Sequence, residues 1–273
     1  MIKEVVEMKV IAVNIDKGGT GKTTFTYNFA HWLGSQHNKK VLLIDADTSC
    51  DLTRAFPVQS SNSVLGIFTK SEVKIDIFDK NVDLISGSVN LTDDYLDIKS
   101  KQNYYMGFFI WITKNISMLN EKYDYIIVDT KNDKSIVAKN FLVAADVILG
   151  ISEPSINALT AWYRLKQTVN SLKAECVDPL TEKSYVTADA YLIGNAVPHI
   201  GTAGKSFIEM AEKESNYIGM IQSKELFRHT LALQKDIFEL KEGLSNAEKS
   251  RNEAFYTHLN DVYNKIKVKI DEI

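Results

Sequence analysis

The sequence has few of the residues that mark several specialised classes of protein. Only two of its 273 residues are cysteine, Cys50 and Cys176, and only four are proline. Two distant cysteines cannot build a zinc cluster or a disulfide framework, so we expect both to be reduced thiols in a cytoplasmic protein. Thirteen glycines are too few for collagen-like or low-complexity material, and we find no internal repeat.

The chain also lacks a large excess of one charge and any long hydrophobic run. Its 32 Lys and Arg residues against 35 Asp and Glu residues give a formal net charge of -3, which excludes a histone-like polycation but allows a local basic face. Apolar runs such as 106–112 stop well short of the ~18 residues that a membrane-spanning helix needs. We therefore expect a globular protein with no membrane span and no membrane partner.

Seven apolar runs of strand length recur along the chain. Most are unbroken rather than alternating, which is typical of strands buried on both faces of a parallel sheet. Segments with helical spacing lie between them, so the sequence predicts an α/β fold, with a doubly wound, mostly parallel sheet and helices on both faces. The runs are 10–15, 41–44, 82–85, 125–128, 147–151, 190–193 and 217–221.

The length would allow two domains at ~150 residues each, but no linker divides the chain. We expect one domain over 1–273, with a helical C-terminal portion from about 224 and a break near Gly243 and Ser245. Five apolar residues share one face of its last helix, which predicts packing onto the sheet. They are Phe255, Leu259, Val262, Ile266 and Ile270.

A glycine-rich segment follows the first predicted strand and precedes a helix. It reads Asp16-Lys17-Gly18-Gly19-Thr20-Gly21-Lys22-Thr23-Thr24. Successive backbone N–H groups in such a turn, together with a helix N-terminus, bind phosphate oxygens. Lys22 would neutralise the β- and γ-phosphates, and the Thr23 hydroxyl would ligate Mg²⁺. Two lysines cannot fill one phosphate position, so Lys17 either points into solvent or serves a nucleotide bound by a facing subunit.

Here the sequence resembles the deviant Walker A ATPases of the ParA/MinD family, whose fingerprint KGGxGK[ST] is met by residues 17–23. The resemblance implies ATP and Mg²⁺ as cofactors. In the family, the first lysine, matched by Lys17, reaches across an ATP-sandwich dimer to the phosphates of the partner. It therefore also implies a homodimer that forms when ATP is bound.

Two acidic segments extend the resemblance. Residues 41–47 look like the family's hydrophobic-D-x-D segment, which would place Asp47 near the attacking water and Asp45 near the magnesium shell. Residues 125–130 look like a Walker B strand, in which Asp129 would hold Mg²⁺ through water beside Thr23. Carboxylates at the C-terminal edge of a parallel sheet lie where ligands bind in such folds. The alternative for either Asp45 or Asp47 is a helix cap.

The segment 191–195 resembles the family strand whose terminal asparagine, here Asn195, reads the adenine edge. A strand-ending Asn can instead form a turn. No N-K-x-D guanine signature occurs, so adenine is favoured over guanine. Three segments depart from the family pattern: Thr48-Ser49-Cys50 replaces Pro-Gln, Lys131-Asn132-Asp133 replaces prolines, and Ile221-Gln222 stands where Ile-Pro is usual.

Within the family, the sequence looks most like a small plasmid-type ParA partition protein. It offers no C-x-x-C for an iron–sulfur cluster, and its end alternates polar and apolar residues, unlike the membrane helix of MinD. The resemblance implies a nucleoid-associated ATPase that binds DNA non-specifically and is stimulated by a ParB-type centromere-binding protein. Basic candidates for DNA contact are Lys205, Lys224, Arg228, Lys235, Lys249, Arg251, Lys265, Lys267 and Lys269, although glutamates lie among them.

The expected function is therefore DNA segregation. Lys17, Lys22 and Asp47 would be catalytic, residues 18–24 and Asn195 would bind the nucleotide, and Thr23, Asp45 and Asp129 would hold the metal. The alternative is a MinD-like or cargo-positioning ATPase that acts on a protein or a membrane.

Overall fold

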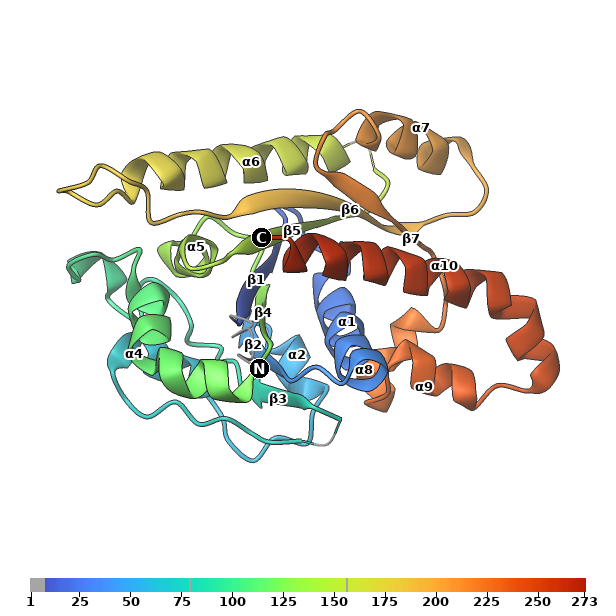
Figure 1. The fold of residues 1–273 in the computed structure, drawn as a ribbon, viewed down its shortest axis with the longest axis horizontal. Coiled ribbons are helices and arrows are strands. Elements are labelled where there is room, and N and C mark those ends of the chain that lie inside the picture. Colours follow the sequence, from blue (N-terminus) through green and yellow to red (C-terminus); the bar gives the residue numbers. More distant parts are fainter. Residues whose placement is uncertain (1–7, 79, 156) are drawn as a thin grey trace, which may run out of the picture.

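The structure, a computed structural model, describes residues 8–78, 80–155 and 157–273. A seven-stranded parallel sheet runs through it in the order β3-β2-β4-β1-β5-β6-β7 (Figure 1). Each strand falls on one of the seven predicted apolar runs, so the predicted doubly wound parallel sheet is confirmed. The strands are β1 (Lys9–Asn14), β2 (Val41–Ala46), β3 (Val82–Ile85), β4 (Tyr125–Thr130), β5 (Val147–Ser152), β6 (Asp189–Val197) and β7 (Tyr217–Gln222).

Helices cover both faces of this sheet (Figure 1). α1 and α10 pack on one face, while α4, α5 and α6 pack on the other. The helices are α1 (Lys22–His37), α2 (Asp51–Arg54), α3 (Gly66–Thr69), α4 (Gly107–Lys122), α5 (Ile136–Val143), α6 (Ala158–Glu175), α7 (Thr202–Ala211), α8 (Phe227–Leu233), α9 (Ile237–Glu242) and α10 (Asn246–Asp271).

The unbroken apolar strands are explained by this two-sided coverage. In β2, Val41 and Leu43 belong to the core under α1 and α10, whereas Leu42 and Ile44 belong to the core under α4 and α5. Side chains of a strand alternate between its two faces, so a strand that is covered on both has a nearly continuous apolar sequence, which in β2 is broken only by Asp45 near its end. All six residues of β2 are buried.

The C-terminal helices differ from the prediction at one point. The five apolar residues predicted to share a face of α10 are all buried against the sheet, and Ser245 caps α10 after the expected break. A second break, which the sequence analysis did not predict, separates α8 from α9. Gln234 adopts φ 52°, and the Asp236 carboxylate accepts hydrogen bonds from the N–H groups of Phe238 and Glu239. The D-x-x-E spacing of this capping box was visible in the sequence.

His31 on α1 is a buried polar side chain without a partner among the described residues. It is 6% exposed, neither ring nitrogen makes a hydrogen bond, and it packs against the rings of Tyr27 and Phe56. Burial disfavours the charged imidazolium, and the charge of the nearby Lys80 acts in the same direction. Together they lower the pKa of His31 from 6.5 to about 4.

Because the pKa of His31 is lowered, we expect the folded protein to lose stability in acid. Replacement of His31 by phenylalanine should remove this loss. The neutral imidazole contributes its full share of stability above pH 6.5, and that share is lost as the pH falls towards 4, because the unfolded chain takes up the proton first. From pH 7 to pH 5 the loss is at most about 2 kcal/mol. We expect His31→Phe to unfold at higher urea than the parent chain at pH 5, with a smaller difference at pH 7. An equal difference at both values would show that titration of His31 plays no part.

Candidate functional site

The loop between β1 and α1 presents a row of backbone N–H groups. None of the N–H groups from Gly18 to Thr24 donates a hydrogen bond to a residue that the structure describes, whereas those of Lys17 and Phe25, on either side, bond to Ile15 and Gly21. Gly19 and Gly21 adopt φ values of 73° and 82°, a left-handed conformation that favours glycine. A helix N-terminus preceded by such a loop is a general anion site.

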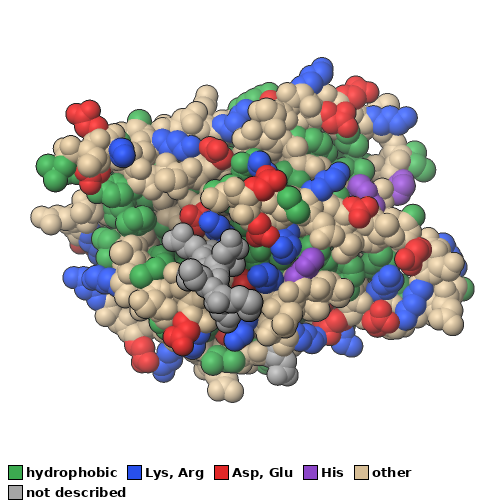
Figure 2. Space-filling view, viewed as in Figure 1, with side chains coloured by type: hydrophobic (Ala, Val, Ile, Leu, Met, Phe, Trp, Pro, Cys, Tyr) green, Lys and Arg blue, Asp and Glu red, His purple; other side chains and the backbone are tan. Residues whose placement is uncertain are grey.

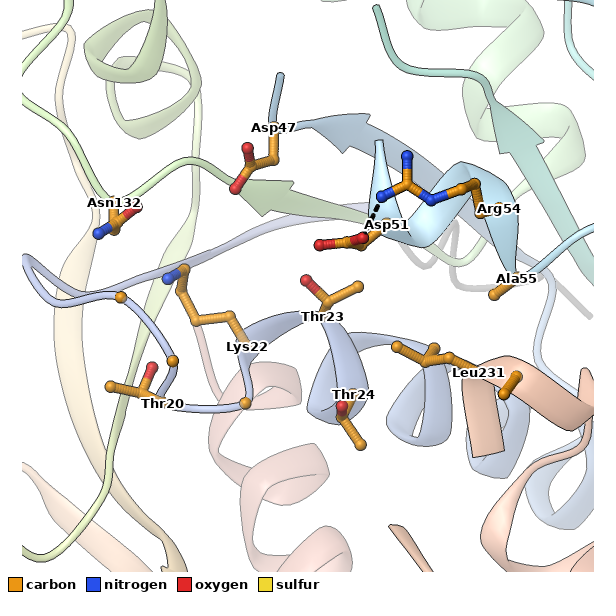
Figure 3. A pocket seen from close by; sticks show the side chains of 14 residues that line it. Thr20, Lys22, Thr23, Thr24, Asp47, Asp51, Arg54, Ala55, Asn132 and Leu231 are labelled. Atoms are coloured by element: carbon orange, nitrogen blue, oxygen red, sulfur yellow. Dashed lines mark hydrogen bonds and ion pairs between the residues drawn. The ribbon is translucent and has the colours of Figure 1, made fainter. Parts of the chain in front are cut away.

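A cavity of about 500 Å³ lies over this loop (Figure 3). Its wall includes every residue from Gly18 to Thr24 and, from the end of β2, Asp47. Figure 3 shows Lys22 and Thr23 below the cavity, with Asp47 facing them from above. The size is within the ~300–1,000 Å³ of small-molecule sites, and the lining suits a phosphorylated ligand. Further lining residues are Asp51, Arg54, Ala55, Asn132, Leu231 and Ala232.

Lys22 and Asp129 form the buried charged centre of the site. Lys22 is 8% exposed; burial lowers its pKa, while the charges of Asp129 and Asp47 act in the opposite direction. Asp129 ends β4 and is 1% exposed. Burial, followed by repulsion from Asp45, raises its pKa to about 7, although a hydrogen bond with the Thr23 hydroxyl and the charge of Lys22 oppose the rise. A bound cation would favour the ionised form of this carboxylate.

The two aspartates at the end of β2 have different surroundings. Asp45 is fully buried, and its carboxylate accepts hydrogen bonds from the Thr53 N–H at 2.8 Å and the Thr53 hydroxyl at 2.6 Å. The same hydroxyl accepts a hydrogen bond from the Gly87 N–H. Asp47 lines the cavity and also accepts the Ser49 N–H at 2.9 Å. Asp47 thus lies on the side of the phosphate loop. Asp45 lies behind Asp47, and its carboxylate holds α2 through Thr53.

A divalent metal fits this arrangement only together with phosphate oxygens. Within the described residues, no three His, Cys, Asp or Glu side chains form a group that could hold a metal ion. Mg²⁺ commonly uses one or two carboxylates with substrate phosphates and water. The Thr23 hydroxyl and the Asp129 carboxylate, which interact with each other, are such a pair of oxygen donors, and the Thr26 hydroxyl lies 3.5 Å from Asp129 Oδ1.

A second cavity, of about 220 Å³, lies on the other side of the loop. It shares Gly19, Thr20, Gly21 and Thr24 with the first cavity, so the two are continuous along the loop. Asn195, at the end of β6, lines it and donates a hydrogen bond from Nδ2 to the Thr20 carbonyl at 2.7 Å. The predicted adenine reader therefore lies beside the loop, with its oxygen available. The rest of the lining mixes apolar, polar and charged residues: Phe25, Glu153, Ala196, Ile221, Gln222, Ser223, Lys224, Phe227, Arg228 and Tyr263.

Gly21 touches Asn195, and this contact gives a matched pair of glycine variants. A Cβ atom at Gly21 would lie 2.5 Å from Asn195 Nδ2, whereas one at Gly19 would meet nothing within 4 Å. Both positions have left-handed φ, so each alanine costs about 1–2 kcal/mol in backbone conformation. We expect Gly21→Ala to unfold at clearly lower urea than Gly19→Ala, because only Gly21→Ala must also displace Asn195.

The contribution of the clash can be isolated. Adding Asn195→Ala to Gly21→Ala should recover stability, although Asn195→Ala alone should lower it through the lost bond to Thr20. Additive effects of the two substitutions would contradict the predicted contact.

Lys17 lies outside both cavities. Its Nζ donates to Glu153 Oε1 at 2.7 Å and to Ser155 Oγ at 3.0 Å, both in the loop after β5. Its side chain is 26% exposed, so it remains at the surface while Lys22 occupies the phosphate cavity. The two lysines of the loop therefore have separate positions, as the sequence requires.

Several residues at the site were not predicted from the sequence. Glu153 and Ser155 hold Lys17, and no motif marked them. Asp51 and Arg54 on α2 form an ion pair on the cavity wall (Figure 3), and their positions four and seven residues after Asp47 were the only available signal. Asn132, noted only as a departure from the family pattern, faces Gly18 and lines the cavity.

The predicted DNA-contacting cations fall into two groups. Five have oxygen acceptors: Lys224 with Asn252, Arg228 with Glu225, Lys249 with Glu242, Lys267 with Asp271 and Lys269 with Glu272. For the other four, no side-chain hydrogen bond or ion pair connects them to the described parts of the chain. These are Lys205, Lys235, Arg251 and Lys265.

Known proteins resemble this chain in sequence and in fold. A family model described as an AAA domain matches residues 8–183. A ParA family protein of Chlamydia pneumoniae is 30% identical over 189 residues, which are 64% of this chain and 69% of the relative. A plasmid partition protein of Borrelia burgdorferi B31, solved bound to AMPPNP, has a TM-score of 0.73 at 20% identity, over 98% of this chain and 100% of its own. Apo McdA of Cyanthece has a TM-score of 0.77 at 19% identity, over 96% and 98%.

The fold and the loop define a P-loop nucleotide-binding protein. The chain belongs to the AAA domain family that matches it and is a P-loop ATPase of the ParA/MinD type. The two solved structures share its fold. No helix in the parts of the chain that the structure describes combines the length and apolar character needed to cross a membrane.

Proposed function

We propose that this protein is a DNA-segregation ATPase in which Mg-ATP closes two subunits into a dimer that holds DNA. The observation that carries the proposal is the separation of the two loop lysines. Lys22 is buried in the phosphate cavity beside Asp129, whereas Lys17 is held at the surface by Glu153 and Ser155. Lys17, held at the surface, cannot contact phosphates in the cavity of its own subunit. We therefore assign it to the phosphates bound by a facing subunit.

We propose one step for each of these residues. The amides of residues 18–24 and Lys22 hold the triphosphate, and the cavity beside Asn195 receives the base. Mg²⁺ beside Thr23 and Asp129 would offset phosphate charge. Asp47 faces the loop across the cavity and orients the attacking water for cleavage of the γ-phosphoryl group. Hydrolysis then releases Lys17 and opens the dimer, with a ParB-type protein as the proposed stimulating partner.

We propose that DNA binds through the four cations without acceptors, since a cation already in an ion pair releases fewer counterions from phosphate. The test is a titration of mixed-sequence duplex DNA with ATP, with ADP and without nucleotide. The proposal requires binding with ATP alone, which weakens steeply as salt rises. Salt-insensitive binding, or no binding, would refute it.

Two neighbouring lysines on α10 provide a matched pair for this titration. Lys265 has no side-chain acceptor among the residues that the structure describes, while Lys267 lies 2.6 Å from Asp271. Lys265→Gln should weaken DNA binding and reduce the salt slope more than Lys267→Gln. Equal effects of the two variants would show that DNA does not bind preferentially through the four cations that lack a side-chain acceptor among the described residues.

One observation favours a second function, the positioning of a protein cargo. Four of the nine candidate cations are paired with carboxylates within the chain, which reduces the charge available for DNA. A membrane target is not favoured, because Ile266 and Ile270 of α10 are buried against the sheet. If the DNA titration fails while ATP-dependent dimers form, a cargo-positioning ATPase is the better description.

A further inference from the structure

A groove that no part of the proposed ATP cycle uses lies between α3 and α4. Its volume is about 1160 Å³, more than twice that of the phosphate cavity, and it shares no lining residue with either nucleotide cavity. One wall is α3 with the following residues to Ile75, and the other is α4 from Gly107 to Met118. We call this the α3–α4 groove.

The wall formed by α4 has a second apolar face. Phe108, Ile112 and Leu119 of this helix are buried in the core under the sheet. Ile110 and Met118, two turns apart, line the groove and are 39% and 36% exposed. A helix on the surface of a globular protein normally has one apolar face and one polar face, so a second apolar face marks an interaction surface.

The charges around this groove have mainly one sign. Its lining includes Lys70, Lys101 and Lys114 against one acidic residue, Glu72. Lys101 donates to the Phe68 carbonyl at 3.0 Å, while no side-chain acceptor for Lys70 or Lys114 occurs in the described ranges. Figure 2 shows Lys and Arg side chains next to hydrophobic ones at the end of the molecule where Figure 1 places α4.

We propose that the α3–α4 groove binds an acidic, amphipathic helix of a partner protein. The apolar face of such a helix would cover Ile110 and Met118, and its carboxylates would pair with Lys70 and Lys114. This is the helix-in-groove mode of recognition, in which Ile110 and Met118 of α4 would contact apolar residues of the partner and Lys114, between them, would contact a carboxylate. The α4 wall, twelve residues from Gly107 to Met118, spans roughly 18 Å, which matches about three turns of a partner helix. The inference goes beyond the proposed ATP cycle and does not depend on it.

The test does not assume the charge of the partner helix, because the peptides that bind are selected from a library of varied charge. A displayed library of 16-residue helices carries apolar residues at i, i+4 and i+8 and random Lys, Glu, Gln or Ala elsewhere. The full-length protein selects binders without nucleotide, and fluorescence anisotropy measures the affinity of the enriched peptides. We expect net acidic peptides, whose affinity falls at least tenfold in Met118→Glu and in Lys114→Glu.

Two variants control for general damage. Lys122→Glu changes the same charge on the same helix outside the groove lining, and Ile200→Glu changes an isoleucine that is 90% exposed near α7. Both should bind the peptides like the parent chain, and circular dichroism should show all four variants folded.

Several results would overturn the proposal. They are no enrichment, enrichment of neutral or basic peptides, and equal binding by Met118→Glu. Displacement of the peptides by duplex DNA would assign the groove to nucleic acid instead. A change of mass by light scattering in Met118→Glu without peptide would assign it to a second copy of this chain.

Discussion

Lys22→Ala is expected to weaken ATP binding by about 30-fold or more. Lys22 is buried in the phosphate cavity, where its ammonium group faces Asp129 and Asp47, and removal of a buried charge partner costs about 2–5 kcal/mol. This corresponds to a loss of affinity of about 30-fold to several thousandfold. Titration with a fluorescent ATP analogue measures it, and Lys17→Ala, in the same loop but outside the cavity, is the matched control.

Two results would contradict the assignment of Lys22. One is ATP affinity within threefold of the parent chain, which would place the phosphates elsewhere. The other is an equal loss of affinity in Lys17→Ala, which would show that the loop tolerates no change of charge. Thermal unfolding without nucleotide distinguishes a lost contact from a lost fold.

Lys17→Ala is expected to bind ATP normally and to remain monomeric. The side chain lies outside both cavities, so its loss should leave the affinity of the separate subunit unchanged. The dimer, in contrast, would lose one phosphate contact at each of its two sites. Light scattering at saturating non-hydrolysable ATP should give the mass of one subunit for Lys17→Ala and of two for the parent chain.

Glu153→Gln provides the control for this experiment. It removes the ion pair at 2.7 Å but keeps the lysine, so it should dimerise at least as well as the parent chain. A dimer of normal mass in Lys17→Ala would eliminate the role of this lysine in the partner's site, whatever the behaviour of Glu153→Gln.

The sheet and the phosphate loop could be predicted because both depend on local sequence. A strand covered on two faces is apolar along most of its length, as Val41 to Ile44 of β2 show, and a phosphate loop needs glycines and lysine at fixed spacing. The partners of Lys17 could not be predicted, since Glu153 lies 136 residues away and only the packing of β5 beside β1 brings it close.

The surface was the least predictable part. The sequence showed glutamates among the basic residues but not which lysine each would pair with. Lys249, for example, forms an ion pair with Glu242 across the turn between α9 and α10. The α3–α4 groove was also not foreseen, because α3 has only four residues and its distance from α4 depends on the whole sheet. The break at Gln234 was not predicted, because the apolar spacing on both sides of it is helical. Its one local signal is the D-x-x-E spacing of Asp236 and Glu239.

The buried carboxylate of Asp45 has a mechanical consequence. Through Thr53 it ties three pieces of backbone together: the end of β2, the start of the segment with Asp51 and Arg54, and the turn after β3 at Gly87. Asp51 and Arg54 therefore cannot shift alone when a ligand enters. They must move together with the strand end that precedes Asp47, or the bonds at Thr53 must break first; a Thr53→Val variant, which keeps the Thr53 N–H bond to Asp45 but loses both hydroxyl bonds, would release only the turn at Gly87.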